Sequence, residues 1–411
     1  MRIPASKSQT IRACLIALAA RGVSVIRHPL YSGDTGSCFT ALESLGCKVT
    51  HDMAGGCAVI DSSRLTEESD IVLDLGNSGT TTYLMYGILG TLGLGRITVT
   101  GDEQLCRRPI GALVSAYRDL GLEGECRTGC PPVRLSGRLT GGRTSIECPT
   151  SQYLSSLLLA LPLAERDSEI EVPLLYEKPY VRMTLDWLDA QKIDYWISAD
   201  LQNVRIRGGQ QWHTFDRGVP ADWSSAAFFL AAAALTGCRL TLQGLDASDS
   251  QGDKRMAGIL EDMGCFVEYG TDSLTIQGPE KLCGGCYDIN DIPDCLPILS
   301  VLGAVTDSPL TLTNVANARI KETDRIAVMA ENLSLLGLKV EQEEDGLTVH
   351  PGKLKGGVTV PCRGDHRIIM AFSILSLVTD GGLTIDDESA SAVTFPSFYS
   401  LLDSIKEDKR K

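Results

Sequence analysis

The densest group of residues that could carry out chemistry is the segment 317–325, which reads Asn-Ala-Arg-Ile-Lys-Glu-Thr-Asp-Arg. An alternating, strand-like run at 310–315 precedes this segment, and a run with helical apolar periodicity follows it. The apolar stripe of that predicted helix consists of Ile326, Val328, Met329 and Leu333. Charges of both signs at a strand-to-helix junction suit anion binding beside a proton-transfer group. Local ion pairs at a solvated helix start explain the same charges equally well.

Polar clusters that precede apolar helical stretches are the second set of candidates. They are Ser6-Lys7-Ser8, Asn77-Ser78-Gly79-Thr80, Thr150-Ser151-Gln152, Asp222-Trp223-Ser224-Ser225, Asp294 and Gly364-Asp365-His366-Arg367. A buried helix that begins in this way presents free N–H groups and the positive end of its dipole, which together can bind an anion. Simple N-capping explains each cluster by itself, including Asp294 before a helix that starts at Leu296. It does not explain the basic residues nearby, which are Lys7, Arg12, Arg107, Arg108, Lys321, Arg325 and Arg367.

The elements that must position these clusters form a repeat. The clusters recur about every seventy residues, which indicates six related units in two pseudo-symmetric halves. The helices behind the clusters are apolar nearly all round, as at 226–235, 296–305 and 368–378, and such helices must be buried. Helices of a second, amphipathic kind lie between the apolar ones. Several of them end in Leu-Gly or Met-Gly, where glycine fits a left-handed C-cap. These glycines are Gly46, Gly121, Gly264 and Gly337. Short alternating strands follow, for example at 239–242 and 339–342.

The composition is typical of a globular protein that binds neither nucleic acid nor a membrane. The 411 residues are 43% apolar and 22% charged, which is enough for one large domain or two to three ordinary ones. The net charge of −14 disfavours nucleic acid and anionic membranes as partners, so a site for anions must be a local basic cleft. Apolar runs stay below the roughly 18 residues of a transmembrane helix. Lys7 and Arg12 interrupt a weak signal-peptide-like stretch, and a cytoplasmic location is expected.

The cysteines indicate reduced thiols. The 14 cysteines are scattered along the chain, and several, such as Cys14, Cys38 and Cys295, lie within apolar runs. Cys283-Gly-Gly-Cys286 lacks a convincing second Cys or His pair, so two free thiols beside a turn are favoured over a zinc or redox site. His366 is expected to be structural or to orient a site residue. The sequence therefore predicts no metal and no other cofactor.

Taken together, the motifs resemble those of the enolpyruvyl transferase family, and in particular its 5-enolpyruvylshikimate-3-phosphate synthase branch. The matching motifs are Ser6-Lys7-Ser8 with Arg12, the segments 75–80, 107–111 and 150–154, Lys178-Pro179-Tyr180, the segment 222–227, Ile292-Pro293-Asp294, the segment 317–325, Asp365-His366-Arg367 and Thr394-Phe395-Pro396. They follow the family's order over nearly the whole chain. The Lys-Glu-Thr-Asp-Arg and Arg-Pro-Ile-Gly motifs are specific, whereas Ser-Lys-Ser or Asn-Ser-Gly-Thr alone is weak.

The resemblance implies an α/β fold of two domains, each an inside-out α/β barrel of three βαβαββ repeats, joined by a two-stranded hinge. The first lobe would span residues 6–218, and the second would combine residues 1–5 with 219–411. The resemblance also implies the reaction. The 5-hydroxyl of shikimate 3-phosphate attacks C2 of phosphoenolpyruvate while C3 is protonated, and phosphate then leaves as C3 loses a proton. The expected partners are these two small molecules, and a monomer is expected.

The resemblance also assigns roles to individual residues. Glu322 would donate the proton to C3, and Asp294 would accept the proton of the 5-hydroxyl; Glu322 could instead only pair with Arg325 three residues later. The residues implied to bind phosphoenolpyruvate are Lys7, Gly79, Arg108, Gln152, Arg325 and Arg367. Those implied to bind shikimate 3-phosphate are Lys7, Ser8, Arg12, Thr150, Ser151, Gln152, Asp294, Asn317 and Lys321.

Three positions depart from the family's pattern. Tyr83 stands where an arginine is usual, Val393 where a lysine is usual, and Glu177 where a phosphate-binding serine commonly precedes Lys-Pro-Tyr. A carboxylate within a few ångströms of the substrate phosphate would cost several kcal/mol, about 4 at an effective dielectric of about 20. We therefore expect Glu177 to turn away from the bound phosphate or to be protonated.

Several alternatives follow from these departures. The chain could be a divergent enolpyruvyl transferase with a related acceptor, possibly one that lacks the 3-phosphate, or a non-catalytic ligand-binding descendant. The retention of both Asp294 and Glu322 argues against the second alternative. An enolpyruvyl transferase acting on UDP-N-acetylglucosamine is disfavoured, because Cys106 lies too close to Arg107 to belong to that enzyme's mobile loop.

Overall fold

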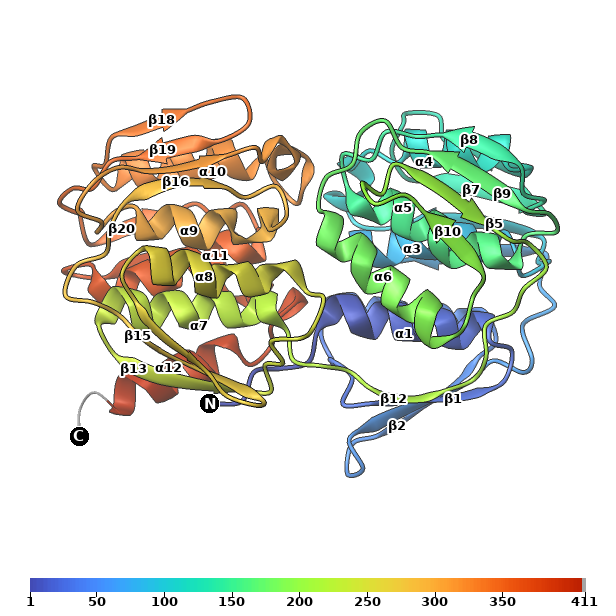
Figure 1. Cartoon of the computed structure of the whole chain (residues 1–411), viewed down its shortest axis with the longest axis horizontal. Helices are drawn as coiled ribbons and strands as arrows, with labels where there is room; N and C mark the ends of the chain where they lie inside the picture. The colour runs from blue at the N-terminus through green and yellow to red at the C-terminus, as the bar shows by residue number, and fades with distance from the viewer. Residues whose placement is uncertain (409–411) are drawn as a thin grey trace. The chain divides into compact units, whose positions relative to one another are not determined.

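The computed structural model describes residues 1–408, with side chains described to Ile405, and divides into two compact units (Figure 1). One is Lys7–Val219, the 7–219 unit; the other joins Met1–Ser6 to the chain from Pro220 onward, the C-terminal unit. Each unit is an α/β structure of mixed sheets and helices with its own apolar core. No helix among the described residues is both long and apolar enough to span a bilayer.

The 7–219 unit contains three four-stranded sheets, each accompanied by two helices. The first group is α1 (Lys7–Ala19), β1 (Val23–Arg27), α2 (Gly33–Ser44), β2 (Lys48–Asp52), β3 (Cys57–Asp61) and β12 (Asp216–Gly218). The second is β4 (Asp70–Asp74), α3 (Gly79–Leu89), β5 (Arg96–Thr100), α4 (Gly111–Asp119), β6 (Leu122–Glu125) and β7 (Val133–Gly137). The third is β8 (Arg143–Ser145), α5 (Ser151–Ala160), β9 (Ser168–Glu171), α6 (Lys178–Ala190), β10 (Tyr195–Ile197) and β11 (Asn203–Ile206).

The three sheets share one topology, with orders β12-β1-β3-β2, β4-β5-β7-β6 and β8-β9-β11-β10. In each sheet one pair is parallel, namely β12 with β1, β4 with β5 and β8 with β9, and the remaining pairs are antiparallel. The pairs β4 with β5 and β8 with β9 are each joined across a buried helix, α3 and α5, as parallel strands require a crossover. The first sheet is completed by β12, which comes from the far end of the unit.

The C-terminal unit repeats the pattern less completely. Its first group is α7 (Trp223–Thr236), β13 (Arg239–Gln243), α8 (Arg255–Asp262), β14 (Phe266–Tyr269) and β15 (Ser273–Gln277). Its second is β16 (Gly285–Asp288), α9 (Leu296–Leu302), β17 (Leu310–Thr313), α10 (Arg325–Leu335), β18 (Val340–Gln342) and β19 (Leu347–Val349). Its third is β20 (Val358–Val360), α11 (His366–Leu375), β21 (Leu383–Ile385) and α12 (Phe398–Asp408).

The second sheet of this unit, β16-β17-β19-β18, has the same topology as those of the 7–219 unit, with β16 parallel to β17. The first sheet has three strands, and a parallel bridge between Arg2 and Gln243 stands where its fourth strand would lie. Within the described residues the third sheet consists of the parallel pair β20 and β21.

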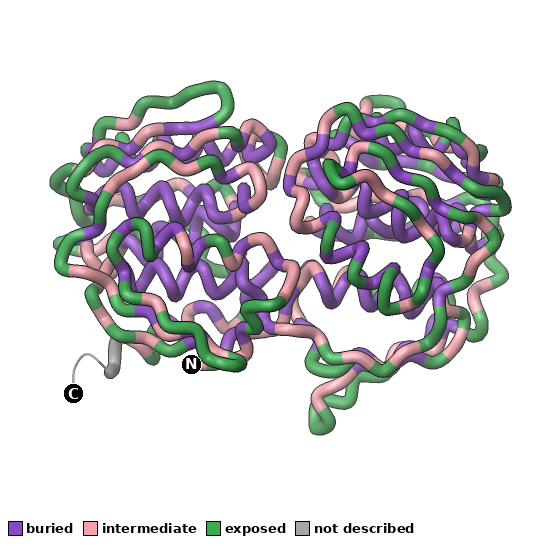
Figure 2. The backbone as a smooth tube through the Cα atoms, viewed as in Figure 1, coloured by how far each residue is buried: buried purple, intermediate pink, exposed green. Residues whose placement is uncertain are grey.

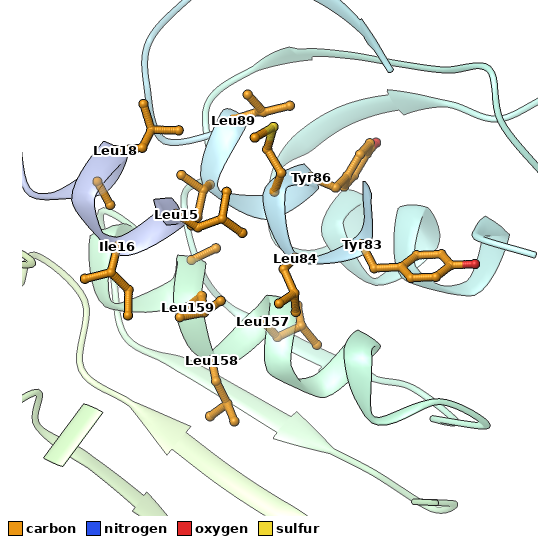
Figure 3. Close-up of a cluster of buried hydrophobic side chains, with 14 of the residues drawn as sticks. Leu15, Ile16, Leu18, Tyr83, Leu84, Tyr86, Leu89, Leu157, Leu158 and Leu159 are labelled. Carbon is orange, nitrogen blue, oxygen red and sulfur yellow. The ribbon is translucent and has the colours of Figure 1, made fainter. Parts of the chain in front are cut away.

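The helices that the sequence predicts to be buried are buried (Figure 2). All residues of α9 and α11 are buried, and α7 is buried from Trp223 to Ala234. In the 7–219 unit α3 packs against α1 and α5, and leucines of these three helices fill the core beside Tyr86 (Figure 3). The glycines predicted at helix ends, Gly46, Gly121, Gly264 and Gly337, all have φ between 93° and 98°.

Two predicted helix ends are wrong, and the alternative in which Asp294 only caps a helix does not hold. The helix predicted at 296–305 ends at Leu302, because Ala304 and Val305 donate to the carbonyls three residues earlier and form a tighter turn. The helix predicted at 368–378 likewise ends at Leu375 and continues as a 3₁₀ turn, Ser376–Val378. Asp294 does not cap α9, because it lies inside a 3₁₀ turn, Pro293–Cys295, whose backbone leads directly into the helix.

Candidate active site

The residues predicted to form the site fall into two groups, one in each unit. Ser78, Thr150, Asp222 and Asp365 cap helices α3, α5, α7 and α11, as the polar clusters predicted. Each cap side chain accepts a hydrogen bond from a backbone N–H of the first helical turn, which satisfies one of the unpaired donors there. The two groups are described separately below.

Lys7 is the first residue of α1, and its ammonium group is paired with a carboxylate that the sequence did not single out. The Lys7 Nζ atom lies 2.9 Å from Asp34 Oδ2, and the side chains of both residues are largely buried. Asp34 belongs to the first turn of α2. Lys7 is therefore held in a fixed direction rather than extended into solvent, as a surface lysine would be.

Arg12 lies one turn further along α1 and is almost completely buried. Its guanidinium donates to Thr184 Oγ1 at 2.9 Å, Ser155 Oγ at 3.4 Å, the Tyr180 carbonyl at 2.9 Å and the Ser8 carbonyl at 3.1 Å. These acceptors are all neutral oxygens. Burial lowers the pKa of Arg12 to about 10, and the Tyr180 hydroxyl opposes this shift. Arg12 thus places a positive charge among α1, α5 and α6.

Gly79 and Arg108 lie in direct contact, as the resemblance implies for two residues of one phosphate site. Gly79 begins α3, and a Cβ atom added there would come within 2.6 Å of Arg108 Nη1. Arg108 is largely buried and donates from Nη2 to Asn77 Oδ1 at 2.7 Å. The guanidinium therefore lies over the N-terminus of α3, where the helix dipole is also positive.

Tyr83, which replaces the family's usual arginine, lies one turn after Gly79 on α3. It is largely buried and contacts Tyr153 of α5 edge to face, with ring centroids 5.5 Å apart. Tyr153 donates to the carbonyl of Pro109, next to Arg108. Figure 3 shows Tyr83 at the edge of the leucine cluster. The pair of tyrosines is thus attached to the residue that follows Arg108, but it supplies no positive charge.

Glu177 lies against the N-terminus of α5, in contact with residues predicted to bind the acceptor. Its Oε2 atom accepts hydrogen bonds from Ser151 Oγ at 2.8 Å, Ser151 N at 3.1 Å and Thr150 Oγ1 at 3.2 Å. Only 2% of Glu177 is exposed. The carboxylate is therefore turned towards Thr150 and Ser151. That Glu177 turns away from a bound phosphate, or is protonated beside it, stays a prediction.

Gln152 follows Ser151 in the first turn of α5 and is half-buried. Its Oε1 atom is buried and accepts no hydrogen bond from the described residues. An amide oxygen in this state has unused capacity to accept a hydrogen bond, which suits a residue that awaits a ligand hydroxyl or amide donor.

In the C-terminal unit the predicted residues gather around Arg325, the first residue of α10. Its guanidinium donates to Asp365 Oδ2 at 2.9 Å, Asp294 Oδ1 at 2.9 Å and Glu322 Oε2 at 2.5 Å. The Arg325 side chain is 1% exposed. Burial alone would lower the pKa of Arg325, but the three carboxylates outweigh that effect and raise it above its ordinary value. The alternative in which Glu322 pairs with Arg325 at i+3 is thus correct as a description of the ligand-free protein.

Asp294 is held by two guanidinium groups. Its Oδ1 atom accepts from Arg325, and its Oδ2 atom lies 2.9 Å from Arg367 Nη2. Burial raises the pKa of Asp294, but the charges of Arg367, Lys321 and Arg325 outweigh burial and hold the pKa well below its usual range. Asp294 is therefore an ionised carboxylate at neutral pH, ready to accept a hydrogen bond from a hydroxyl.

Asp365 and His366 were not included among the predicted site residues, although the sequence places them beside Arg367. Asp365 is fully buried, caps α11 through the N–H of Arg367 and accepts a hydrogen bond from Thr323 Oγ1 at 3.1 Å. His366 is also buried, and burial lowers its pKa to about 4. Asp365 thus joins α11 to the segment before α10 and orients both arginines.

The remaining predicted residues of this unit lie close to the same segment. Asn317 is buried within a 3₁₀ turn, Ala316–Ile320, and Lys321 is the residue that ends that turn. Lys321 is near enough to Asp294 to lower its pKa. Val393, where the family usually has lysine, is half-buried at the end of another 3₁₀ turn, Glu388–Val393. In the C-terminal unit the structure therefore brings Asp294, Glu322, Arg325 and Arg367 together.

The chemistry available to these groups is proton transfer beside anion binding. Asp294 and Glu322 are two carboxylates attached to one guanidinium, and Arg325 and Arg367 offer planar forks that match carboxylates and phosphates. In the 7–219 unit, Lys7, Arg108 and the starts of α3 and α5 offer further donors to anions.

Comparison with known proteins agrees with this chemistry. A sequence model of the family described as "EPSP synthase (3-phosphoshikimate 1-carboxyvinyltransferase)" matches residues 1–402. A 3-phosphoshikimate 1-carboxyvinyltransferase of Acetivibrio thermocellus is 42% identical over 405 residues, covering 98% of this chain and 94% of that protein. A chloroplastic 3-phosphoshikimate 1-carboxyvinyltransferase of Brassica napus is 35% identical, covering 98% of this chain and 82% of that protein.

Solved structures give the same result at the level of the fold. The structure of EPSP synthase from Acinetobacter baumannii has a TM-score of 0.80 and 27% identity, covering 98% of this chain and 94% of that chain. The enolpyruvyl transferase NikO from Streptomyces tendae has a TM-score of 0.79 at 18% identity, which is a likeness of fold alone. Because the family match spans nearly all of the sequence, the chain belongs to the EPSP synthase (3-phosphoshikimate 1-carboxyvinyltransferase) family of transferases.

Proposed function

We propose that this chain transfers the enolpyruvyl group of phosphoenolpyruvate to the 5-hydroxyl of shikimate 3-phosphate and releases phosphate, a step of aromatic amino acid biosynthesis. The observation that carries the proposal is the attachment of Asp294 and Glu322 to the single guanidinium of Arg325, with Arg367 beside them. The reaction needs two proton-transfer groups next to fixed cations, and this cluster supplies both. Membership of the family supports the choice of substrates.

In the first step the 5-hydroxyl oxygen forms a bond to C2 of phosphoenolpyruvate. Asp294 takes the hydroxyl proton, and Glu322 donates a proton to C3, so the double bond is replaced by a tetrahedral centre. In the second step the bond from C2 to the phosphate oxygen breaks, the departing phosphate takes the proton from Asp294, and C3 returns a proton to the Glu322 carboxylate, which restores the double bond. Each acid–base group is expected to contribute about 10²- to 10⁴-fold to the rate.

Binding the two anionic substrates falls to the basic residues and helix starts. Lys7, Gly79, Arg108, Gln152, Arg325 and Arg367 would hold phosphoenolpyruvate, and Lys7, Ser8, Arg12, Thr150, Ser151, Gln152, Asp294, Asn317 and Lys321 would hold shikimate 3-phosphate. Arg325 and Arg367 are paired with carboxylates of the chain itself. Phosphoenolpyruvate therefore has to replace part of these contacts, and as it does so the hold of Arg325 on Glu322 weakens. A weaker pair favours the protonated form of Glu322 that the reaction needs.

The test is the release of phosphate from phosphoenolpyruvate by the purified chain, with shikimate 3-phosphate or shikimate as the acceptor. We expect shikimate 3-phosphate to support rapid release and shikimate to support little. A preference for shikimate would favour an enolpyruvyl transferase whose acceptor lacks the phosphate, an alternative suggested by the contact of Glu177 with Thr150 and Ser151. Binding of shikimate 3-phosphate without phosphate release would favour a non-catalytic descendant. The cytoplasmic location and the monomeric state remain predictions from the sequence.

A further inference from the structure

The feature that the proposed reaction does not use is the carboxylate of Glu177. Glu177 lies immediately before α6 in a left-handed backbone conformation, with φ 57°, and Pro179 follows in the first turn. Left-handed φ values are uncommon for residues other than glycine, asparagine and aspartate. The backbone at this position directs the side chain towards α5, where it is 98% shielded from solvent.

The surroundings of this carboxylate are those of a bound anion. One oxygen, Oε2, accepts hydrogen bonds from the backbone N–H of Ser151, from the Ser151 hydroxyl and from the Thr150 hydroxyl. The start of α5 adds the positive end of a ten-residue helix. Hydrogen bonds from several fixed donors to one charged oxygen are the arrangement by which proteins hold phosphate oxygens as well.

A buried positive charge lies on the same side of α5. Arg12 donates to Ser155 Oγ, on α5 itself, and to the carbonyl of Tyr180, three residues after Glu177. The acceptors of its guanidinium among the described residues are neutral oxygens, so its charge is not cancelled by a direct ion pair there. The region between α1, α5 and the start of α6 is therefore suited to more negative charge than a single carboxylate supplies.

We propose that Glu177 is an internal competitor of the acceptor's phosphate group. Its carboxylate occupies the donors of Thr150 and Ser151, and a phosphorylated acceptor binds only after the carboxylate has left them. Glu177 thereby sets the affinity for the phosphate ester without taking part in the chemistry. This proposal rests on the proposed function, since it assumes that Thr150 and Ser151 receive the acceptor's phosphate.

The test compares Glu177→Gln and Glu177→Ser with the unmodified chain, using shikimate 3-phosphate and shikimate as ligands in calorimetry without phosphoenolpyruvate. Both substitutions remove the competing charge, so we expect the Kd for shikimate 3-phosphate to fall at least about tenfold, because tenfold in Kd is the effect of one modest electrostatic contact. The Kd for shikimate should change by less than about twofold. The matched control is Glu147→Gln, because Glu147 is exposed and lies three residues before Thr150.

Thermal unfolding provides a second measurement, because its expected result differs from the result that a purely structural role of Glu177 predicts. Without ligand, both Glu177 variants should melt about 3 °C lower than the unmodified chain, because the start of α5 loses its anion. Saturating shikimate 3-phosphate should then raise Tm more in the variants than in the unmodified chain, because tighter binding stabilises the folded state more. A structural role alone predicts the lower Tm without the larger ligand effect.

Two results would overturn the proposal: an unchanged or higher Kd for shikimate 3-phosphate in both variants, or an equal gain in affinity for shikimate. Phosphate release is measured separately. If the unmodified chain releases no phosphate with either acceptor while the Kd values change as expected, the proposed function fails and the role of Glu177 in anion binding stands. If turnover is normal but the Kd values do not move, only the role of Glu177 fails.

Discussion

A single buried guanidinium, that of Arg325, determines the electrostatics of the C-terminal half of the candidate site. Removing a charge from water costs several kcal/mol, and the cost is recovered only when partners of opposite charge are well placed. Arg325 has three such partners, Asp294, Glu322 and Asp365, and Arg367 compensates the excess negative charge. These ion pairs hold the carboxylates of Asp294 and Glu322 in fixed positions, which is the preorganisation that the proposed proton transfers would need.

The first prediction at this scale concerns the proposed acid. Glu322→Gln keeps the shape of the side chain but cannot supply a proton to C3, so we expect kcat to fall by about 10²- to 10⁴-fold while the KM of shikimate 3-phosphate changes little. The measurement is steady-state phosphate release. Glu331→Gln is the control, since Glu331 pairs with Arg363 at the exposed surface of α10 and should retain normal turnover. A kcat within about fivefold of normal for Glu322→Gln would exclude it as the proton donor.

A second prediction concerns the contact between Gly79 and Arg108. Gly79→Ala would place a methyl group 2.6 Å from Arg108 Nη1, so the guanidinium has to shift. If Arg108 holds phosphoenolpyruvate, the KM for phosphoenolpyruvate should rise by about tenfold or more, because a hydrogen bond to a charged group is worth about 1.5–3 kcal/mol. The Kd of shikimate 3-phosphate should stay within about twofold. Gly258→Ala is the control, because a Cβ atom there meets no atom within 4 Å.

A third prediction concerns His366 and pH. In the folded protein its pKa is lowered from 6.5 to about 4 by burial, so the unfolded chain binds a proton between these pH values that the folded chain does not bind. The folded state is therefore destabilised as pH falls from about 6.5 to about 4, by about 3 kcal/mol in total. His366→Gln should remove this part of the pH dependence. Denaturant unfolding at pH 7, 5.5 and 4.5 gives the free energy of unfolding of both proteins. If that free energy changed with pH to the same degree in both, His366 would not be the source of the pH dependence.

At the residue scale the sequence identified the charges but not all of their partners. The pairing of Glu322 with Arg325 could be predicted because the two residues are only three positions apart in the sequence. The pairings of Lys7 with Asp34 and of Arg325 with Asp365 span 27 and 40 residues. Such contacts depend on how α1 packs on α2 and on the start of α10 meeting the cap of α11, and no local pattern encodes either arrangement.

The elements were more predictable than the contacts between them. All-round apolar composition correctly predicted that α7, α9 and α11 are buried, since no face of these helices tolerates solvent. Leu-Gly and Met-Gly correctly predicted left-handed helix ends. The alternative in which Asp294 only caps α9 does not hold, because the tertiary attraction of Arg325 and Arg367 competes for the carboxylate, and local capping preference is worth only about 1 kcal/mol.

A prediction at the scale of elements concerns the start of α10. The Asp324 side chain caps this helix by accepting from Ala327 N at 3.0 Å, and it also accepts from Arg319 Nη1 at 2.7 Å. Asp324→Ala should cost about 1 kcal/mol of stability through the lost cap. It should also lower kcat/KM by more than fivefold, because the first residue of the helix is Arg325. The measurements are denaturant unfolding and phosphate release.

The control for this change is Asp246→Ala, which removes a carboxylate that accepts from Ser248 in an exposed turn of the same unit. It should affect stability to a similar degree and leave kcat/KM unchanged. If Asp324→Ala also left kcat/KM unchanged, the position of Arg325 would not depend on the helix start.

At the scale of the whole molecule, the sequence repeat predicted the α/β architecture, and the sheets of both units show why. Among the described residues four sheets share one order of strands with one parallel pair, and in three of them that pair is joined across a buried helix. The period of about seventy residues could be recognised because each repeat has to bury the same kind of helix. In the described part of the C-terminal unit the first sheet has three strands and the last has two. The spacing of the polar clusters did not predict these departures.

The last prediction concerns the two cores. Buried apolar residues form one cluster in the 7–219 unit and another in the C-terminal unit, and the chain passes between the units at Ser6–Lys7 and Val219–Pro220. Leu158→Ala in α5 and Leu299→Ala in α9 each create a cavity that costs about 2–5 kcal/mol. We expect each change to accelerate amide hydrogen exchange by orders of magnitude in its own unit and by less than about threefold in the other, because units with separate cores open separately. Each variant is the control for the other, measured by mass spectrometry on the full chain. Equal acceleration in both units for either variant would mean that the protein unfolds as one cooperative body.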